Sequence, residues 1–247
     1  MDLKEMIYKR RSTRSYTGEP VDETTIQKIK DFITSLKPLY PDIKVRAEIV
    51  SKDSVRCLMP WITPQLVSIF SEEKEGFLEN VGFLFQQLEL YMYSLGLGVC
   101  WLGLGRLNAQ GKEETQNGDN LKFVILLAFG HPKGEGLRES IAEFNRRDLS
   151  QICDTPDERL EPARLAPSSV NSQPWYFTHE GDVFHAYCMP QGIFRARPSK
   201  ALGEMNQIDM GIALAHMYVS NPDTFRFFKA DRVQAVKGAA YIGSFTI

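Results

Sequence analysis

Two polar segments in opposite halves of the chain carry the residue types best suited to hold a phosphorylated ring. The arginine segment, residues 10–14, reads Arg-Arg-Ser-Thr-Arg, and the proline-serine loop, residues 166–175, reads Ala-Pro-Ser-Ser-Val-Asn-Ser-Gln-Pro-Trp. A guanidinium donates two parallel hydrogen bonds to phosphate oxygens, and a serine hydroxyl adds a third donor. Small hydroxyl and amide side chains between prolines offer many hydrogen-bonding groups at little bulk, which suits the edge of a planar heterocycle. Together the two segments predict a site for a phosphorylated ring.

Other kinds of chemistry have weaker support in the sequence. The four cysteines, Cys57, Cys100, Cys153 and Cys188, are widely scattered, and no C-x-x-C or Cys/His spacing occurs. We therefore expect neither a zinc site nor a disulfide framework. The Gly-x-Gly pairs do not extend into the strand-to-helix Gly-x-Gly-x-x-Gly fingerprint of a Rossmann site. No metal ligand and no catalytic acid, base or nucleophile is assigned.

Composition limits the class of protein. A chain of 247 residues can form one large domain or two small ones. The balance of 29 Lys and Arg against 31 Asp and Glu gives no sign of a nucleic-acid or membrane-surface partner. The longest apolar run, residues 123–129, is far shorter than the roughly 20 residues that span a bilayer. The charged start Met-Asp-Leu-Lys-Glu does not resemble a signal peptide, so we expect a cytoplasmic protein.

The first half alternates helix and strand signals. The pattern predicts a short helix at residues 6–11, a longer one at 22–35 and a strand at 47–51. Residues 76–95 carry apolar side chains every three or four positions, which predicts a long buried helix ended by Gly-Leu-Gly. The continuous apolar run at 123–129 predicts a strand covered on both faces.

The second half repeats this order of elements. We expect a helix at 156–165, a hairpin with strands at 176–179 and 183–187, a helix at 208–219 and a final strand at 241–247. Within the last helix, Asp209, Met210 and Gly211 are expected to serve helix packing, and Gly211 would let a neighbour approach closely. Each half thus combines an early helix, strands, a long buried helix and a late strand, which indicates a degenerate internal duplication.

In these motifs the chain resembles the nitroreductase family of FMN-dependent flavoproteins. The matching pieces are residues 10–14 with 20–23, the glycine-rich stretch 94–103, the proline-serine loop and, less specifically, the basic stretch 144–150. The resemblance implies an α+β fold, with a central antiparallel or mixed sheet flanked by helices. It divides the chain into a first half, residues 1–147, on the phosphate side and a second half, residues 148–247, on the flavin-ring side.

The order of the motifs departs from that of the family. In the usual member the proline-serine loop follows the arginine segment within one helix, where this chain has Leu-Lys-Pro-Leu-Tyr-Pro at residues 36–41. Family members are intertwined homodimers in which one subunit supplies the arginines and its partner supplies the loop. A fused pseudo-dimer that keeps one of two equivalent sites would show this arrangement. We expect one FMN between the halves, complete within one chain that is a monomer or a weak dimer.

The resemblance, with the chemistry of the side chains, gives each residue an expected role. Arg10 and Ser12 would bind the phosphate with help from Arg11, and Arg14 would lie near the flavin pyrimidine. Arg146 and Arg147 would approach the phosphate. A turn at Trp101, Leu102 and Gly103 would bring backbone N–H groups to the ring. The expected ring-lining residues are Pro167, Ser168, Ser169, Asn171 and Gln173, with Trp175 anchoring the loop.

The expected activity is that of an oxidoreductase that passes electrons from NADH or NADPH through FMN to a nitroaromatic or quinone acceptor. Three alternatives stay open. The chain could bind FMN for storage, sensing or an interaction without fast turnover, or it could act as a related dehalogenase or in oxygen-dependent ring chemistry. The third alternative is that the chain has no flavin site: residues 10–14 would then be only a solvated charged face, and residues 166–175 only a turn that ends a helix.

Overall fold

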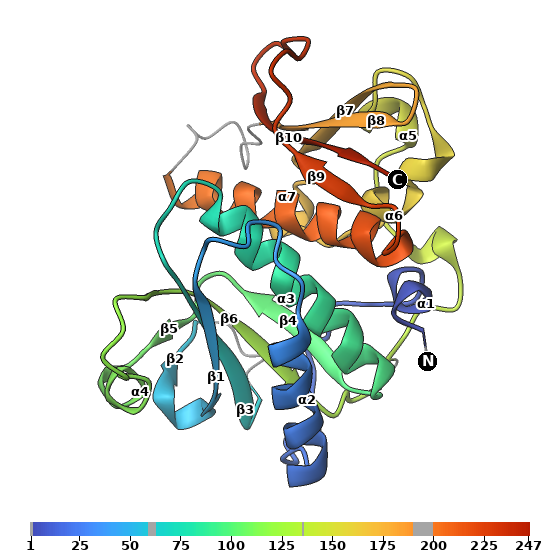
Figure 1. Cartoon of the computed structure of the whole chain (residues 1–247). Helices are drawn as coiled ribbons and strands as arrows, with labels where there is room; N and C mark the ends of the chain where they lie inside the picture. Colours follow the sequence, from blue (N-terminus) through green and yellow to red (C-terminus); the bar gives the residue numbers. More distant parts are fainter. Residues whose placement is uncertain (1, 59–62, 135, 190–199) are drawn as a thin grey trace. The chain divides into compact units, whose positions relative to one another are not determined.

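The computed structural model describes residues 2–58, 63–134, 136–189 and 200–247 (Figure 1). The chain divides into two compact units. The first unit comprises Met1–Phe77 and Leu88–Ile141, and the second comprises Leu78–Gln87 and Ala142–Ile247. One long helix, α3 (Phe77–Ser94), supplies residues to both units.

The first unit is built on a four-stranded antiparallel sheet in the order β1-β3-β6-β4. Its strands are β1 (Val45–Ser51), β3 (Gln65–Ser71), β4 (Gly98–Leu102) and β6 (Lys122–Gly130). A two-stranded sheet joins β2 (Val55–Arg56) to β5 (Arg106–Leu107), and the helices of this unit besides α3 are α1 (Leu3–Ile7), α2 (Glu23–Ser35) and α4 (Ala109–Glu114).

The apolar run at residues 123–129 forms most of β6, an inner strand of this sheet. Leu126 and Ala128 belong to a core cluster on one face, and the alternating Ile125, Leu127 and Phe129 are equally buried. Successive side chains of a strand point to opposite faces, so both faces of β6 are covered, as predicted.

The predicted long helix at 76–95 is confirmed as α3, Phe77–Ser94. Gly96, two residues after the last residue of the helix, takes φ +81° and turns the chain away. The Leu97 N–H donates to the Met92 carbonyl (3.0 Å), and the Gly96 N–H donates to the Tyr93 carbonyl (3.0 Å). This pair of bonds is a Schellman motif, and the left-handed residue it needs is most often glycine.

The short N-terminal helix lies earlier than predicted. It spans Leu3–Ile7 instead of 6–11, because the Asp2 carboxylate accepts the Lys4 N–H and caps the first turn there. The arginine segment therefore follows the helix and lies outside it. The sequence analysis did not predict β3. It did predict α2, which begins one residue after its predicted start because Asp22 is its N-cap.

The second unit has a four-stranded antiparallel sheet in the order β7-β8-β10-β9. Its strands are β7 (Trp175–Glu180), β8 (Val183–Cys188), β9 (Arg226–Phe228) and β10 (Ala240–Thr246), and its helices besides α3 are α5 (Leu149–Ile152), α6 (Glu161–Arg164) and α7 (Lys200–Ser220). The predicted hairpin is confirmed, with Gly181 at φ +60° in its turn. The predicted helix at 156–165 is shorter: a 3₁₀ turn, Glu158–Leu160, leads into the single turn of α6.

The two sheets share one topology. In each sheet, the first two strands in the sequence are neighbours and a long helix follows them. The fourth strand in the sequence then lies between the second and the third. The corresponding sets are β1, β3, α3, β4, β6 and β7, β8, α7, β9, β10 (Figure 1). Both sheets are antiparallel, so the architecture is α+β, as expected.

Two glycines let the N-terminal turns of α3 cross α7 closely within the second unit. A Cβ at Gly82 would lie 2.0 Å from the Ile208 carbonyl oxygen, and a Cβ at Gly211 would lie 1.9 Å from the Glu79 carbonyl oxygen. Any side chain at either position would force the helix backbones apart. The expected close approach at Gly211 is confirmed.

Among the described residues, no helix is long and apolar enough to cross a membrane.

Candidate functional site

The arginine segment is anchored by a buried ion pair. The Arg10 guanidinium is 1 % exposed and donates through Nη2 to Glu89 Oε1 (3.1 Å) and to Ser12 Oγ (2.8 Å). It also lies over the Tyr93 ring, 5.7 Å from the centroid. Burial is the largest single effect and opposes the charge of Arg10, but Glu89, Tyr93 and Cys100 together outweigh it and raise the pKa of the guanidinium. Arg10 is therefore a fixed cation behind the segment, in contact with Ser12.

The backbone of the segment is held against β4. The Thr13 N–H donates to the Val99 carbonyl (2.9 Å), and the Tyr93 hydroxyl, which has one proton to donate, lies within hydrogen-bond distance of the carbonyls of Arg11 and Val99. This approach requires Gly98, because a Cβ there would lie 2.5 Å from Thr13 Oγ1. The hydrogen bonds fix the segment as an extended strap along β4.

The other polar residues of the arginine segment lie nearer the surface than Arg10. Arg11 and Ser12 are half-buried, and Arg14 is exposed. Burial raises the pKa of the Cys100 thiol to about 11, and the charge of Arg14 acts in the opposite direction. Within the first unit the structure thus brings the predicted cations and hydroxyl together.

The predicted turn at residues 101–103 begins later than expected. Trp101 and Leu102 are the last residues of β4 and pair with Leu127 and Leu126 of β6. Leu102 is buried in the core, so its side chain belongs to packing. The turn starts at Gly103, whose carbonyl accepts a hydrogen bond from Arg106 Nη1 (2.9 Å). The expectation of a turn is therefore wrong for Trp101 and Leu102 and holds for Gly103.

The proline-serine loop has an unusual backbone. Val170, Asn171 and Gln173 take positive φ values of 48°, 57° and 49°. Such a conformation in non-glycine residues costs about 1–3 kcal/mol each and persists only where neighbouring groups hold it. The loop also exposes 67 % of the Val170 side chain. Several bonds must therefore maintain this shape.

Those bonds come from the two arginines that precede α5. Arg146 donates to Asn171 Oδ1 (2.8 Å) and to the Ala166 carbonyl (2.9 Å), and the Arg147 N–H donates to Gln173 Oε1 (2.7 Å). Arg146, Arg147 and the loop all belong to the second unit, so these hydrogen bonds stabilise the loop within that unit. Sequence reasoning had given them a phosphate role and not this one.

The amides of the loop also have partners within the second unit. Asn171 Nδ2 donates to the Asn145 carbonyl (3.0 Å), and Gln173 Nε2 donates to the Asn171 carbonyl (3.2 Å). Ser168 Oγ accepts the Gln173 N–H (2.9 Å). Pro167 and Trp175 are buried, and Ser169 is half-buried. The amides thus fix the shape of the loop, which the sequence alone did not reveal.

Asp209 of α7 is a site residue that sequence reasoning assigned to helix packing. Its carboxylate oxygens accept the Ser169 N–H (3.1 and 3.0 Å), and Oδ2 also accepts from the Ser172 hydroxyl (3.3 Å). Burial raises the pKa of this carboxyl to about 8, although the two donors act in the opposite direction. The sequence signal for both acidic residues is the same: Asp209 lies between Ile208 and Met210, and Glu89 lies between Leu88 and Leu90, so each interrupts the apolar side chains of a buried helix.

Comparisons with known proteins agree with this architecture. The sequence profile of a family described as "Putative TM nitroreductase" matches residues 2–221. A crystal structure from Thermotoga maritima MSB8, described as a "putative nitroreductase", superposes with a TM-score of 0.63 at 18% identity, covering 99% of this chain and 92% of that one. No curated protein matches the chain in sequence.

Two smaller proteins match part of the chain. A nitroreductase family protein from Clostridium difficile 630 gives a TM-score of 0.49 at 18% identity over 62% of this chain and 96% of its own. A protein from Clostridium difficile R20291 named an FMN-dependent nitroreductase gives 0.43 at 16% identity over 55% and 89%.

The fold and the profile match define the class: the protein is of the nitroreductase type. Because the profile covers most of the chain, the protein belongs to the family described as "Putative TM nitroreductase".

Proposed function

We propose that the protein is an FMN-dependent oxidoreductase that takes electrons from NADH or NADPH and passes them to a small electron-poor acceptor, a nitroaromatic or a quinone. Membership of a nitroreductase family supports the reaction class. When bound, FMN would supply the electron-transfer chemistry, and the protein would bind, orient and shield it. The electron donor and the acceptor are part of the proposal.

The residues of the arginine segment fit a phosphate. Arg10 Nε is buried and has no hydrogen-bond partner among the described residues, although the same guanidinium is fixed by Glu89. Ser12 Oγ accepts a bond from Arg10, which leaves the hydroxyl proton of Ser12 to be donated elsewhere. A phosphate near Ser12 would meet a hydroxyl donor and a fixed positive charge. This is the observation that carries the proposal.

The remaining residues have proposed roles that rest on their chemistry and on the family resemblance. Arg11 would add a second cation to the phosphate, and the exposed Arg14 would face the flavin pyrimidine, where a positive charge stabilises the anionic reduced ring. Gly103 and the half-buried Trp101 would approach the ring from the end of β4. In the second unit, Ser168 and Ser169 would contact FMN, with the shape of their loop fixed by Arg146 and Arg147.

Comparing FMN with riboflavin, which lacks the phosphate, tests these assignments. Ser12→Ala should weaken FMN binding by about 1.5–3 kcal/mol, the range for a hydrogen bond to a charged group, and barely change riboflavin binding. Arg14→Ala, the matched control for the ring, should weaken both ligands alike. Equal losses for the two flavins in Ser12→Ala would remove Ser12 from the phosphate site.

Activity requires a separate measurement. Protein loaded with FMN should oxidise NADH or NADPH steadily when a quinone or nitroaromatic is added. Bound FMN that neither nicotinamide reduces would instead identify a flavin-binding protein without turnover, and the oxidoreductase proposal would be wrong.

We further propose that the chain is a fused pseudo-dimer in which both motif sets serve one FMN. The shared strand order of the two sheets supports a duplication. One variant would carry Arg10→Ala with Arg14→Ala, and the other Ser168→Ala with Asn171→Ala. Each should bind FMN poorly, and refolding the two together should not restore binding. Recovery of flavin absorbance in the mixture would show that two chains build the site.

A further inference from the structure

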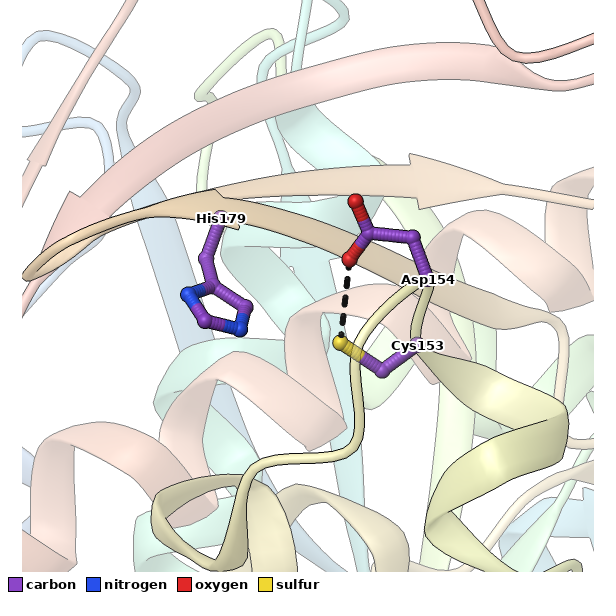
Figure 2. A group of neighbouring side chains, drawn as sticks. All are labelled: Cys153, Asp154 and His179. Carbon is purple, nitrogen blue, oxygen red and sulfur yellow. Dashed lines mark hydrogen bonds between the residues drawn. The ribbon is translucent and has the colours of Figure 1, made fainter.

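Three potential metal ligands converge at one edge of the second sheet. Cys153, Asp154 and His179 each offer a ligand atom, and these atoms lie within 4.8 Å of one another (Figure 2). The group combines a thiol, a carboxylate and an imidazole, which are the three side-chain donors that zinc binds in proteins. It belongs entirely to the second unit and shares no residue with the proposed flavin site.

Backbone pairing holds the three residues in place. Cys153 forms a parallel bridge with Phe177 of β7, and the Asp154 N–H donates to the Phe177 carbonyl (3.1 Å). His179 follows two residues later on the same strand, and β7 is the outer strand of its sheet. Two hydrogen-bonded segments therefore present the ligands, so their separation is set by the sheet and not by a flexible loop.

Short polar contacts hold the thiol of Cys153 in place. Its Sγ lies 2.9 Å from the Thr155 carbonyl oxygen and 3.5 Å from Asp154 Oδ1. His179 Nε2 lies 3.3 Å from the same carbonyl and 3.9 Å from Asp157 Oδ2. A cation that replaces the thiol proton would meet an imidazole and a carboxylate already turned toward the sulfur.

A cavity adjoins the cluster. It has a volume of about 370 Å³, and its lining includes Asp154, Thr178, His179 and His185. Thr178 is 6 % exposed, and its Oγ1 has no hydrogen-bond partner in the part of the chain that the structure describes. The cavity gives an ion a path to the ligands and room for water in a fourth position.

We propose that Cys153, Asp154 and His179 form a binding site for a thiophilic divalent cation of the zinc class, with water as the fourth ligand. Metal–ligand bonds of about 2.0–2.3 Å in a tetrahedron place ligand atoms about 3.3–3.7 Å apart, so small side-chain rotations complete the site. Binding forms the metal–sulfur bond and releases the thiol proton to solvent, with no change in oxidation state. The site would fix residues 153–154 to the edge of β7.

Cobalt(II) is the probe that tests this site, because its thiolate complexes have charge-transfer and ligand-field absorption. Titration of the flavin-loaded protein, recorded as a difference spectrum against the metal-free protein, should show about one cobalt per chain with a tetrahedral ligand-field band beyond the flavin absorption. Zinc should displace the cobalt and abolish the band. Absence of a tetrahedral band, or a band that zinc does not remove, would overturn the proposal.

Variants identify the ligands. Cys153→Ser should lose the thiolate charge-transfer absorption, and Asp154→Asn and His179→Ala should weaken cobalt binding at least about tenfold, or 1.4 kcal/mol. Asp154 is exposed, so Asp154→Asn provides a test even if the buried Cys153→Ser does not fold. The matched controls are Cys57→Ser, the least buried cysteine, and His185→Ala, a cavity residue outside the ligand set. Unchanged binding in Asp154→Asn, or loss of binding in Cys57→Ser, would contradict the assignment.

Discussion

At the residue scale, the arginine segment depends on a buried charge pair. Arg10 and Glu89 are both almost fully buried, so removing one partner leaves an uncompensated charge in the interior. Breaking such a pair typically costs about 3–5 kcal/mol. We expect Glu89→Gln to lower the free energy of unfolding by that amount in urea titrations.

The matched control for Glu89→Gln is Glu5→Gln. Glu5 also pairs with a cation, Lys9, but both side chains are more than 40 % exposed. An exposed pair contributes about 0–1 kcal/mol, so Glu5→Gln should change little. If the two variants were equally stable, the Arg10–Glu89 pair would not anchor the segment.

Asp209 predicts a pH dependence of stability. Its pKa is raised by burial from 3.8 in the ordinary case to about 8 in the folded protein. Between those values the folded state retains a proton that the unfolded state has lost, so this residue's contribution to stability decreases as the pH rises toward 8. Asp209→Asn cannot titrate and should lack this contribution.

The comparison needs urea titrations of both proteins from pH 5 to pH 9. The difference in unfolding free energy, wild type minus Asp209→Asn, should fall up to about pH 8 and then level off. Parallel pH profiles would mean that Asp209 does not titrate as proposed.

At the element scale, the crossing of α3 and α7 depends on glycine. In Gly211→Ala the new methyl group would collide with the α3 backbone, and overpacking of this kind costs about 1–3 kcal/mol. Gly203→Ala on the same helix has nothing within 4 Å and should stabilise by up to about 1 kcal/mol through helix propensity. Equal midpoints of urea unfolding for the two variants would refute the close crossing.

Local sequence patterns predicted the elements whose signals are local. The stripe of α3, the apolar run of β6 and the β7–β8 hairpin follow from periodicity and turn residues, and the structure has all three. The N-terminal helix lies earlier than its apolar pattern predicts because Asp2 caps it ahead of Leu3. The helix predicted at 156–165 is longer than the observed one, because the helical pattern begins before α6, in residues that form a 3₁₀ turn at Glu158–Leu160.

The sequence predicts which motifs belong to the candidate site, but it does not predict the contacts that hold those motifs in place. The sequence shows where the arginine segment and the proline-serine loop lie. It does not show that Glu89, 79 positions from Arg10, forms an ion pair with that arginine, because the pairing is created by the fold. The same holds for Arg146, which binds Asn171 25 positions away, and for Cys153 and His179, which only sheet pairing brings together.

At the scale of the whole molecule, one topology occurs twice, but the residues placed on it differ. The first unit retains the arginine segment and the second retains the proline-serine loop, each fixed by its own buried or bracing partners: Glu89 for the first, and Arg146 with Asp209 for the second. We propose that duplication followed by loss of one motif from each copy accounts for both facts. On this proposal the chain would keep one flavin site, where a symmetric dimer would have two.

The amount and identity of flavin released from the protein test this account most directly. Purified protein would be incubated with excess FMN, freed of unbound flavin and denatured, and the released flavin would be separated and quantified against the chain concentration. We predict FMN, at one molecule per chain. Release of two molecules per chain, preferential retention of FAD, or no retained flavin would contradict the central claim.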